Sequence, residues 1–197
     1  MPLYIHHRRN RRAELADVPA EAGVEIDLRS DGRGGIRLAH DADERGESLG
    51  DWLDSFGTSS RFLVLNVKDD GLEERVTHLL AARKIANYAF LDSTIPTRVR
   101  WAEAGHGRRF FARLSSYEPL ESLPPFHGLH EWLWVDCFAG QPLAARTVAR
   151  AKEHFRICLV SPELHGAPQR LREFGELFPL ADAICTKIPR DWEQTFG

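Results

Sequence analysis

Two acidic residues, two positions apart, are the first in this chain whose types and spacing could do chemistry. Glu25 and Asp27 interrupt an otherwise apolar run, GVEIDL. In a β-strand, residues two positions apart point to the same face, so the two carboxylates are expected to lie side by side. Neighbouring carboxylates repel each other unless a cation neutralises them. Oxygen ligands of this kind favour Mg²⁺ or Ca²⁺, so the pair predicts a divalent-cation site.

Two histidines and a lysine follow other extended segments. His7 comes after an apolar run at the N-terminus, His40 ends the segment 35–40, and Lys68 follows the run 62–67. Histidines titrate near neutral pH and can serve as a general acid and a general base. A lysine and a divalent cation stabilise negative charge on a phosphoryl group. The set therefore predicts acid–base chemistry on a phosphate ester.

Eight short, β-rich apolar runs recur along the chain and are expected to be strands. They cover residues 3–6, 23–28, 62–67, 88–91, 110–114, 132–137, 156–160 and 183–185. Several are apolar on both faces, as in the strands of a buried parallel sheet. Between them, helices are expected at 49–56, 72–85, 94–104, 117–123, 143–155 and 169–178. A strand followed by a helix, repeated about every 20–26 residues, indicates successive βα units.

These repeats predict an α/β fold, namely a compact barrel of the (β/α)8 TIM type that forms a single domain over residues 1–197. The segment 35–40 predicts a β-hairpin after the second strand, joined across the turn SDGRGG. Such barrels usually take about 250 residues, so a shorter chain needs loops close to the minimum. The alternative is an open, doubly wound sheet. In a barrel, catalytic residues gather at the carboxyl ends of the strands.

Composition excludes several classes of function. The chain has 26 Lys and Arg against 29 Asp and Glu, a net charge of −3, which argues against a nucleic-acid partner. No apolar run reaches the roughly 18 residues that would span a membrane. An N-terminus without a signal-peptide core and three widely spaced cysteines predict a cytoplasmic protein with free thiols. No pattern indicates the oligomeric state.

The order and spacing of these residues resemble the N-terminal signature of the glycerophosphodiester phosphodiesterases. The resemblance extends to their barrel relatives, including enzymes like phosphatidylinositol-specific phospholipase C. The signature has His-Arg after the first strand, Glu-x-Asp on the second, an Asp-Gly turn and then His-Asp. Here it reads His7-Arg8, Glu25 and Asp27, Asp31-Gly32, and His40-Asp41. The match covers about residues 3–68, and beyond it only the alternation of strands and helices agrees.

The resemblance implies a metal-dependent phosphodiesterase in which His7 and His40 are the acid–base pair. His40 would protonate the leaving group. Arg8 and Lys68 would bind phosphate oxygens, Arg8 as a bidentate donor and Lys68 as a point charge.

The metal site that the resemblance implies consists of Glu25, Asp27 and Asn66. Asn66 stands where the family carries a third metal-binding Glu. An amide oxygen can ligate Mg²⁺ or Ca²⁺, but it brings one negative charge fewer.

A small phosphodiester is the expected substrate, and its identity stays open. Few residues separate His40 from the helix expected at 49–56, so the insertion that caps the substrate in glycerol-specific enzymes is missing. Further candidate substrate contacts are Asn10, Trp134, Asp136 and Lys187. Two alternatives remain: a non-catalytic barrel that binds phosphate esters, and a lyase or transferase that passes the phosphoryl group to an acceptor other than water.

Overall fold

The computed structural model describes residues 1–57 and 59–197 and divides them into two compact units. We call His6–Trp101 the N-terminal unit, and Met1–Ile5 together with Ala102–Gly197 the C-terminal unit. Strand β1 (Leu3–His6) carries the chain from one unit into the other. The expectation of a single domain stays a prediction.

The N-terminal unit is built on three parallel strands, β2 (Gly23–Ser30), β5 (Leu63–Val67) and β6 (Tyr88–Leu91), paired in that order. The short strand β3 (Ile36–Leu38) runs antiparallel to β2, and β4 (Glu47–Ser48) runs antiparallel to β3. Asp27 and Asn66 are register partners, so side chains from neighbouring strands meet at the ends of β2 and β5.

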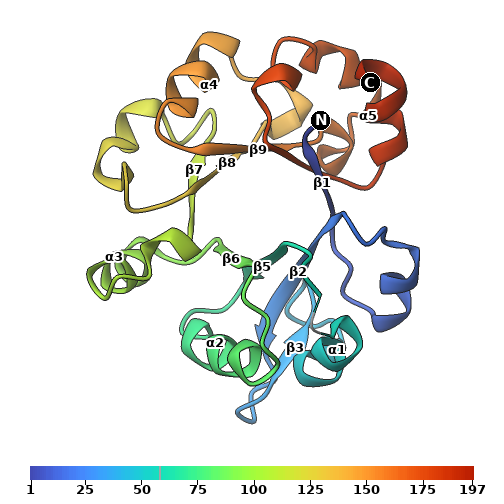
Figure 1. Ribbon diagram of the computed structural model, residues 1–197, viewed down its shortest axis with the longest axis vertical. Helices are drawn as coiled ribbons and strands as arrows, with labels where there is room; N and C mark the ends of the chain where they lie inside the picture. The colour runs from blue at the N-terminus through green and yellow to red at the C-terminus, as the bar shows by residue number, and fades with distance from the viewer. Residues whose placement is uncertain (58) are drawn as a thin grey trace. The chain divides into compact units, whose positions relative to one another are not determined.

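Two helices of this unit lie beside its strands in Figure 1: α1 (Leu49–Phe56) and α2 (Glu73–Ala82). A further helix, α3 (Ile95–Glu103), follows β6. Helix α1 buries Leu49, Trp52, Leu53 and Phe56, the spacing of one helical face. Burial of this stripe is what holds a helix of only two turns, because an isolated helix of that length is unstable in water.

The C-terminal unit is built on four parallel strands, β7 (Phe111–Leu114), β8 (Trp132–Val135), β9 (Arg156–Val160) and β10 (Ala183–Thr186). Its helices α4 (Ala145–Lys152) and α5 (Pro189–Phe196) lie on one side of these strands (Figure 1). Its core includes Leu133, Ile157, Ile184, Val148 and Trp192, all fully buried.

Short 3-10 helices fill most of the remaining connections. They are η1 (Arg12–Asp17), η2 (Gly107–Arg109), η3 (Leu120–Ser122), η4 (Pro124–Phe126), η5 (Phe138–Gly140), η6 (Pro162–His165), η7 (Pro168–Phe174) and η8 (Phe178–Leu180).

All eight predicted strands are present, each within two residues of its expected bounds at either end. The helix expected at 169–178 is instead a pair of 3-10 segments, η7 and η8. Proline opens η7, Gly175 follows seven residues later and Pro179 interrupts what comes next, so no continuous α-helix forms. The helix expected at 117–123 is likewise reduced to 3-10 turns after Pro119.

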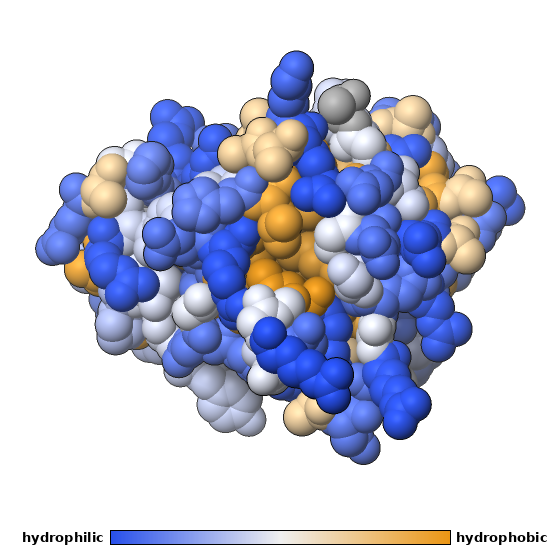
Figure 2. Space-filling view, turned by 90° about the horizontal axis from the view of Figure 1, so that it is seen from below, coloured by the Kyte–Doolittle hydropathy of each residue, from blue (hydrophilic) through white to orange (hydrophobic). Residues whose placement is uncertain are grey.

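Hydrophilic residues predominate on the face shown in Figure 2, and hydrophobic ones gather mainly in one hollow. Within the described residues, no helix is both long enough and apolar enough to cross a membrane. The three cysteines, Cys137, Cys158 and Cys185, are free and buried.

We expect Trp192 to be a main determinant of the stability of the C-terminal unit. Its indole is fully buried, donates a hydrogen bond to Ser161 Oγ at 2.7 Å and contacts the rings of Phe174 and Phe178. Trp192→Ala should lower the free energy of unfolding by about 3–5 kcal/mol, as for other large core aromatics. Urea unfolding followed by circular dichroism measures this loss.

The matched control is Tyr117→Ala, because Tyr117 is 81% exposed. It should change the free energy of unfolding by no more than about 0.5 kcal/mol. Equal losses from the two variants would contradict this account of the core.

Candidate active site

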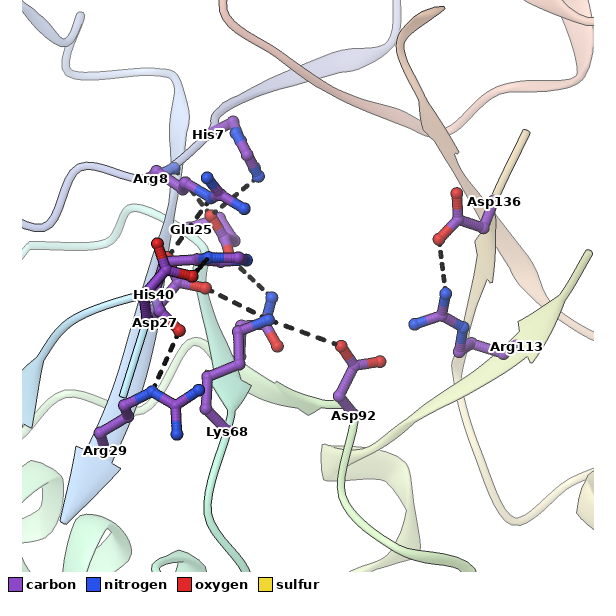
Figure 3. Close-up of polar contacts among 12 residues, drawn as sticks. His7, Arg8, Glu25, Asp27, Arg29, His40, Lys68, Asp92, Arg113 and Asp136 are labelled. Carbon is purple, nitrogen blue, oxygen red and sulfur yellow. Dashed lines mark hydrogen bonds and ion pairs between the residues drawn. The ribbon is translucent and has the colours of Figure 1, made fainter. Parts of the chain in front are cut away.

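The site is organised around two carboxylates on β2. Glu25 and Asp27 are both 0% exposed, and they alternate with the buried apolar residues Val24, Ile26 and Leu28. As the period of two predicts, both acids point to one face of the strand. Figure 3 shows them beside His7, Arg8 and Lys68. All of these residues belong to the N-terminal unit.

The turn after β1 presents its backbone to Glu25. Arg8 has φ 52°, a left-handed conformation that is uncommon outside glycine, and its N–H donates to Glu25 Oε2 at 2.7 Å. His7 Nε2 lies 3.8 Å from the same oxygen. Trp52 Nε1 donates to the carbonyl of Arg9 at 2.9 Å and fixes the turn from the side of α1. The backbone strain at Arg8 is therefore coupled to the anchoring of a buried carboxylate.

Asn10 forms a two-point clamp on Asp27. Its Nδ2 donates to Asp27 Oδ2 at 2.9 Å, and the N–H of Asp27 donates to Asn10 Oδ1 at 2.9 Å. Arg8 Nε lies 3.6 Å from the same Asp27 oxygen. Asn10 thus positions a carboxylate of the site, and its predicted contact with substrate stays a prediction.

Asn66, on β5, joins the site through Glu25. Its Nδ2 donates to Glu25 Oε1 at 3.0 Å. Burial, and then the charge of Asp27, raises the pKa of Glu25 from about 4.5 to about 8. The hydrogen bonds from Arg8 and Asn66 oppose this rise without cancelling it. The buried Glu25 therefore favours one of two states: a proton removes its charge, or a nearby cation balances it.

His40 is held by its backbone and by Asp41. Its Nδ1 lies 2.7 Å from Asp41 Oδ1, which leaves Nε2 as the nitrogen directed to other chemistry. Its carbonyl accepts a hydrogen bond from Arg29 Nε at 3.0 Å, and Arg29 Nη1 donates in turn to Asp69 Oδ1 at 2.7 Å. The N–H of Ala39 donates to the carbonyl of Asp27 at 3.2 Å. The returning hairpin thus brings His40 to the carboxylate strand.

Sequence reasoning missed Arg29, Asp69 and Asp92. Asp92 directly follows β6 and lies 3.9 Å from Lys68 Nζ through its Oδ2. The sequence signal for Asp92 was its position, because a polar residue directly after a buried parallel strand lies at the edge of the sheet where such sites form. No comparable signal marks Arg29 and Asp69, because their pairing joins a residue of β2 to one after β5, 40 positions away in the chain.

Two buried oxygens test whether a divalent cation fits here. Asp27 Oδ1 and Asn66 Oδ1 are both buried, and neither accepts a hydrogen bond from any described residue. Together with the carboxylate of Glu25, they form the oxygen-rich donor set that Mg²⁺ and Ca²⁺ require. Among residues 1–57 and 59–197, no three His, Cys, Asp or Glu side chains gather as a metal site. A cation would therefore have two carboxylates and an amide from the protein, which fits a hard, partly hydrated ion.

The other three candidate contacts lie in the C-terminal unit. Asp136 accepts hydrogen bonds from Arg113 Nη2 at 2.5 Å and from His165 Nε2 at 2.8 Å. Trp134 is buried against Phe111. Lys187 is exposed, and its N–H donates to Glu163 Oε1 at 2.8 Å. Their predicted contact with substrate stays a prediction.

The N-terminal unit therefore gathers two histidines, two buried carboxylates, a guanidinium and an ammonium within one cluster. Such a set can bind an anionic group, neutralise developing charge and move protons at neutral pH.

Comparison with solved structures finds the same fold over almost the whole chain. A glycerophosphodiester phosphodiesterase of Agrobacterium tumefaciens is 12% identical with a TM-score of 0.72, and the match covers 98% of this chain and 100% of that one. One from Parabacteroides distasonis is 13% identical with a TM-score of 0.67, covering 98% and 95%. A phosphodiesterase of Oleispira antarctica, in complex with the product sn-glycerol-3-phosphate, is 16% identical with a TM-score of 0.71, covering 99% and 96%.

No protein-family model matches the chain, and no curated protein does. The matches to solved structures confirm the predicted fold class, an α/β fold of the TIM-barrel type. They also confirm the resemblance to glycerophosphodiester phosphodiesterases at the level of the fold.

The raised pKa of Glu25 predicts how stability depends on pH when no divalent cation is present. The folded protein binds this proton more tightly than the unfolded chain, so the stabilisation is complete below about pH 4.5 and is lost as pH rises through about 8. In EDTA, the Tm of the wild type should fall over this range more steeply than the Tm of Glu25→Gln. Thermal melts across the pH series measure the difference.

Glu74→Gln is the control, because Glu74 is exposed on α2. Its Tm should follow the wild type at every pH. A Glu25→Gln profile parallel to the wild type would mean that Glu25 is ionised throughout.

Proposed function

We propose that the protein is a phosphodiesterase that cleaves a small phosphodiester, with His7 and His40 as base and acid and Mg²⁺ or Ca²⁺ held by Glu25, Asp27 and Asn66. The observation that carries this proposal is the pair of fully buried carboxylates beside the Asn66 amide, in which Asp27 Oδ1 and Asn66 Oδ1 accept no hydrogen bond from the described residues. The fold around these carboxylates supports the proposal, because it is that of glycerophosphodiester phosphodiesterases. One similar structure holds sn-glycerol-3-phosphate.

Arg8 and Lys68 are the proposed phosphate ligands. The side chain of Arg8 is 36% exposed and can turn its guanidinium towards a bound anion. Lys68 is more enclosed, with 17% of its side chain exposed, and supplies a positive charge to the site. A planar fork and a point charge together orient the phosphoryl group and stabilise its added negative charge.

The two histidines move protons at opposite ends of the reaction. His7 accepts the proton of the attacking group, which is water or a hydroxyl of the substrate. His40 donates a proton from Nε2 to the leaving-group oxygen as its bond to phosphorus breaks. The contact between His40 Nδ1 and Asp41 Oδ1 at 2.7 Å holds the ring and leaves Nε2 for the leaving group.

A bound divalent cation would neutralise the two carboxylates and polarise a phosphoryl oxygen. Arg8 and Asn10 would hold Asp27 in place for it, and the backbone of Arg8 would hold Glu25. The proposed compartment is the cytoplasm, whose reducing conditions suit three free cysteines.

Removing either histidine tests the proposed chemistry. His7→Ala and His40→Ala should each lower kcat for bis(p-nitrophenyl) phosphate by about 100- to 10,000-fold, the usual contribution of a general acid or base. His78→Ala, at an exposed position of α2, should leave kcat unchanged. EDTA should abolish the activity, and Mg²⁺ or Ca²⁺ should restore it.

Two other results would indicate a different function. No turnover with any divalent cation, while a phosphate ester still binds, would leave a phosphate-binding protein in place of an enzyme. In ¹⁸O-labelled water, only hydrolysis places the label on the phosphate, so an unlabelled or cyclic product would indicate a transferase or a lyase.

Asn66→Asp tests the cation site separately from catalysis. A third carboxylate should tighten binding of Mg²⁺ or Ca²⁺ by about tenfold, because ligand charge sets affinity at such sites. The same change should lower the Tm in EDTA, since Glu25 loses an amide donor and gains a like charge. Calorimetric titration and thermal melts measure the two effects.

Gln169→Glu adds the same charge at an exposed position and should change neither quantity appreciably. If Asn66→Asp left cation binding unaltered, the proposed ligand set would be wrong.

A further inference from the structure

The ammonium of Lys68 lies between two carboxylates. Its Nζ is 3.4 Å from Asp27 Oδ1 and 3.9 Å from Asp92 Oδ2. Figure 3 shows the side chain of Lys68, the residue after β5, with Asp27 on one side and Asp92 on the other. Only 17% of the Lys68 side chain is exposed, so solvent screens its charge weakly.

One of these two contacts conflicts with the proposed cation. Asp27 Oδ1 is a buried oxygen proposed to ligate Mg²⁺ or Ca²⁺, and it is also the nearer of the two carboxylate oxygens that flank Lys68 Nζ. A divalent cation on Asp27 Oδ1 and the Lys68 ammonium near the same oxygen would repel each other. Cation binding therefore favours movement of Lys68 away from Asp27, where its charge needs another anion.

We propose that Asp92 is that second anion: a positioning residue that draws Lys68 off Asp27 and so opens the carboxylate to a divalent cation. This inference depends on the proposed cation site. With the ion bound, its two charges balance Glu25 and Asp27, and the charge of Lys68 is balanced by Asp92. Without Asp92, a poorly exposed ammonium would compete with the divalent cation for Asp27.

The backbone fixes the position of Asp92 near Lys68. Asp92 has φ 62°, a conformation in which aspartate is one of the better tolerated residues. The next residue is anchored, because Ser93 Oγ donates to the buried carboxylate of Glu73 at 2.7 Å. In the sheet register, Leu91 lies opposite Asn66, which places Asp92 at the end of the strand pair that carries Lys68. A strained, fixed residue at such a position indicates a functional constraint.

The test is binding of Mg²⁺ or Ca²⁺ alone, by calorimetric titration without substrate. Asp92→Asn should raise the Kd by about 2- to 5-fold, the range expected for loss of one partly exposed ion pair. Asp70→Asn is the matched control: it removes the same charge from an exposed position and should leave the Kd unchanged. Circular dichroism and Tm confirm that each variant is folded.

A double-mutant cycle tests whether Asp92 affects cation binding through Lys68. Lys68→Gln removes the competing ammonium and should lower the Kd, and Asp92→Asn should have no further effect in that background. If Asp92→Asn weakened binding equally with and without Lys68, Asp92 would act on the cation directly and the inference would be wrong. No effect of Asp92→Asn in the wild-type background would also overturn it.

Failure of the proposed function gives a different result. If the wild-type protein bound neither Mg²⁺ nor Ca²⁺, both the proposed cation site and this inference would be wrong. If it bound a cation normally but had no phosphodiesterase activity, the inference about Lys68 and Asp92 would still be decided by the cycle.

Discussion

Burial of two carboxylates side by side on one strand is the constraint on which the rest of the N-terminal unit depends. Glu25 and Asp27 have no exposure, so each needs donors supplied by the protein or a charge supplied from outside. The surrounding chain provides donors from four directions: the turn after β1, Asn10, β5 and Lys68. Loop conformation, side-chain choice and strand register all serve this one requirement.

Sequence reasoning predicted the strands and the two acids because both depend on local periodicity. Alternation places Glu25 and Asp27 on one face of β2 whatever the rest of the chain does. His7, His40 and Lys68 could be placed because each ends a strand or a hairpin. The fold class followed from the repeated order of strand and helix, and the matches to solved structures confirm it.

The parts that sequence could not predict depend on contacts between residues far apart in the chain. The left-handed backbone at Arg8, the clamp of Asn10 on Asp27 and the pairing of Arg29 with Asp69 have no local pattern. The prediction of an α-helix at 169–178 was wrong for a different reason. The apolar spacing suits an α-helix, but glycine and proline limit the segment to short 3-10 turns.

The bond from Arg8 to Glu25 comes from the main chain, and this separates two roles at one position. Residues other than proline that tolerate a left-handed backbone, such as glycine, asparagine and aspartate, supply the same N–H, so the Glu25 carboxylate keeps this anchor when one of them replaces Arg8. The Arg8 side chain makes a separate contact, because its Nε lies 3.6 Å from Asp27 Oδ2. A substitution at position 8 would therefore remove a positive charge from beside Asp27 while the main chain still anchored Glu25.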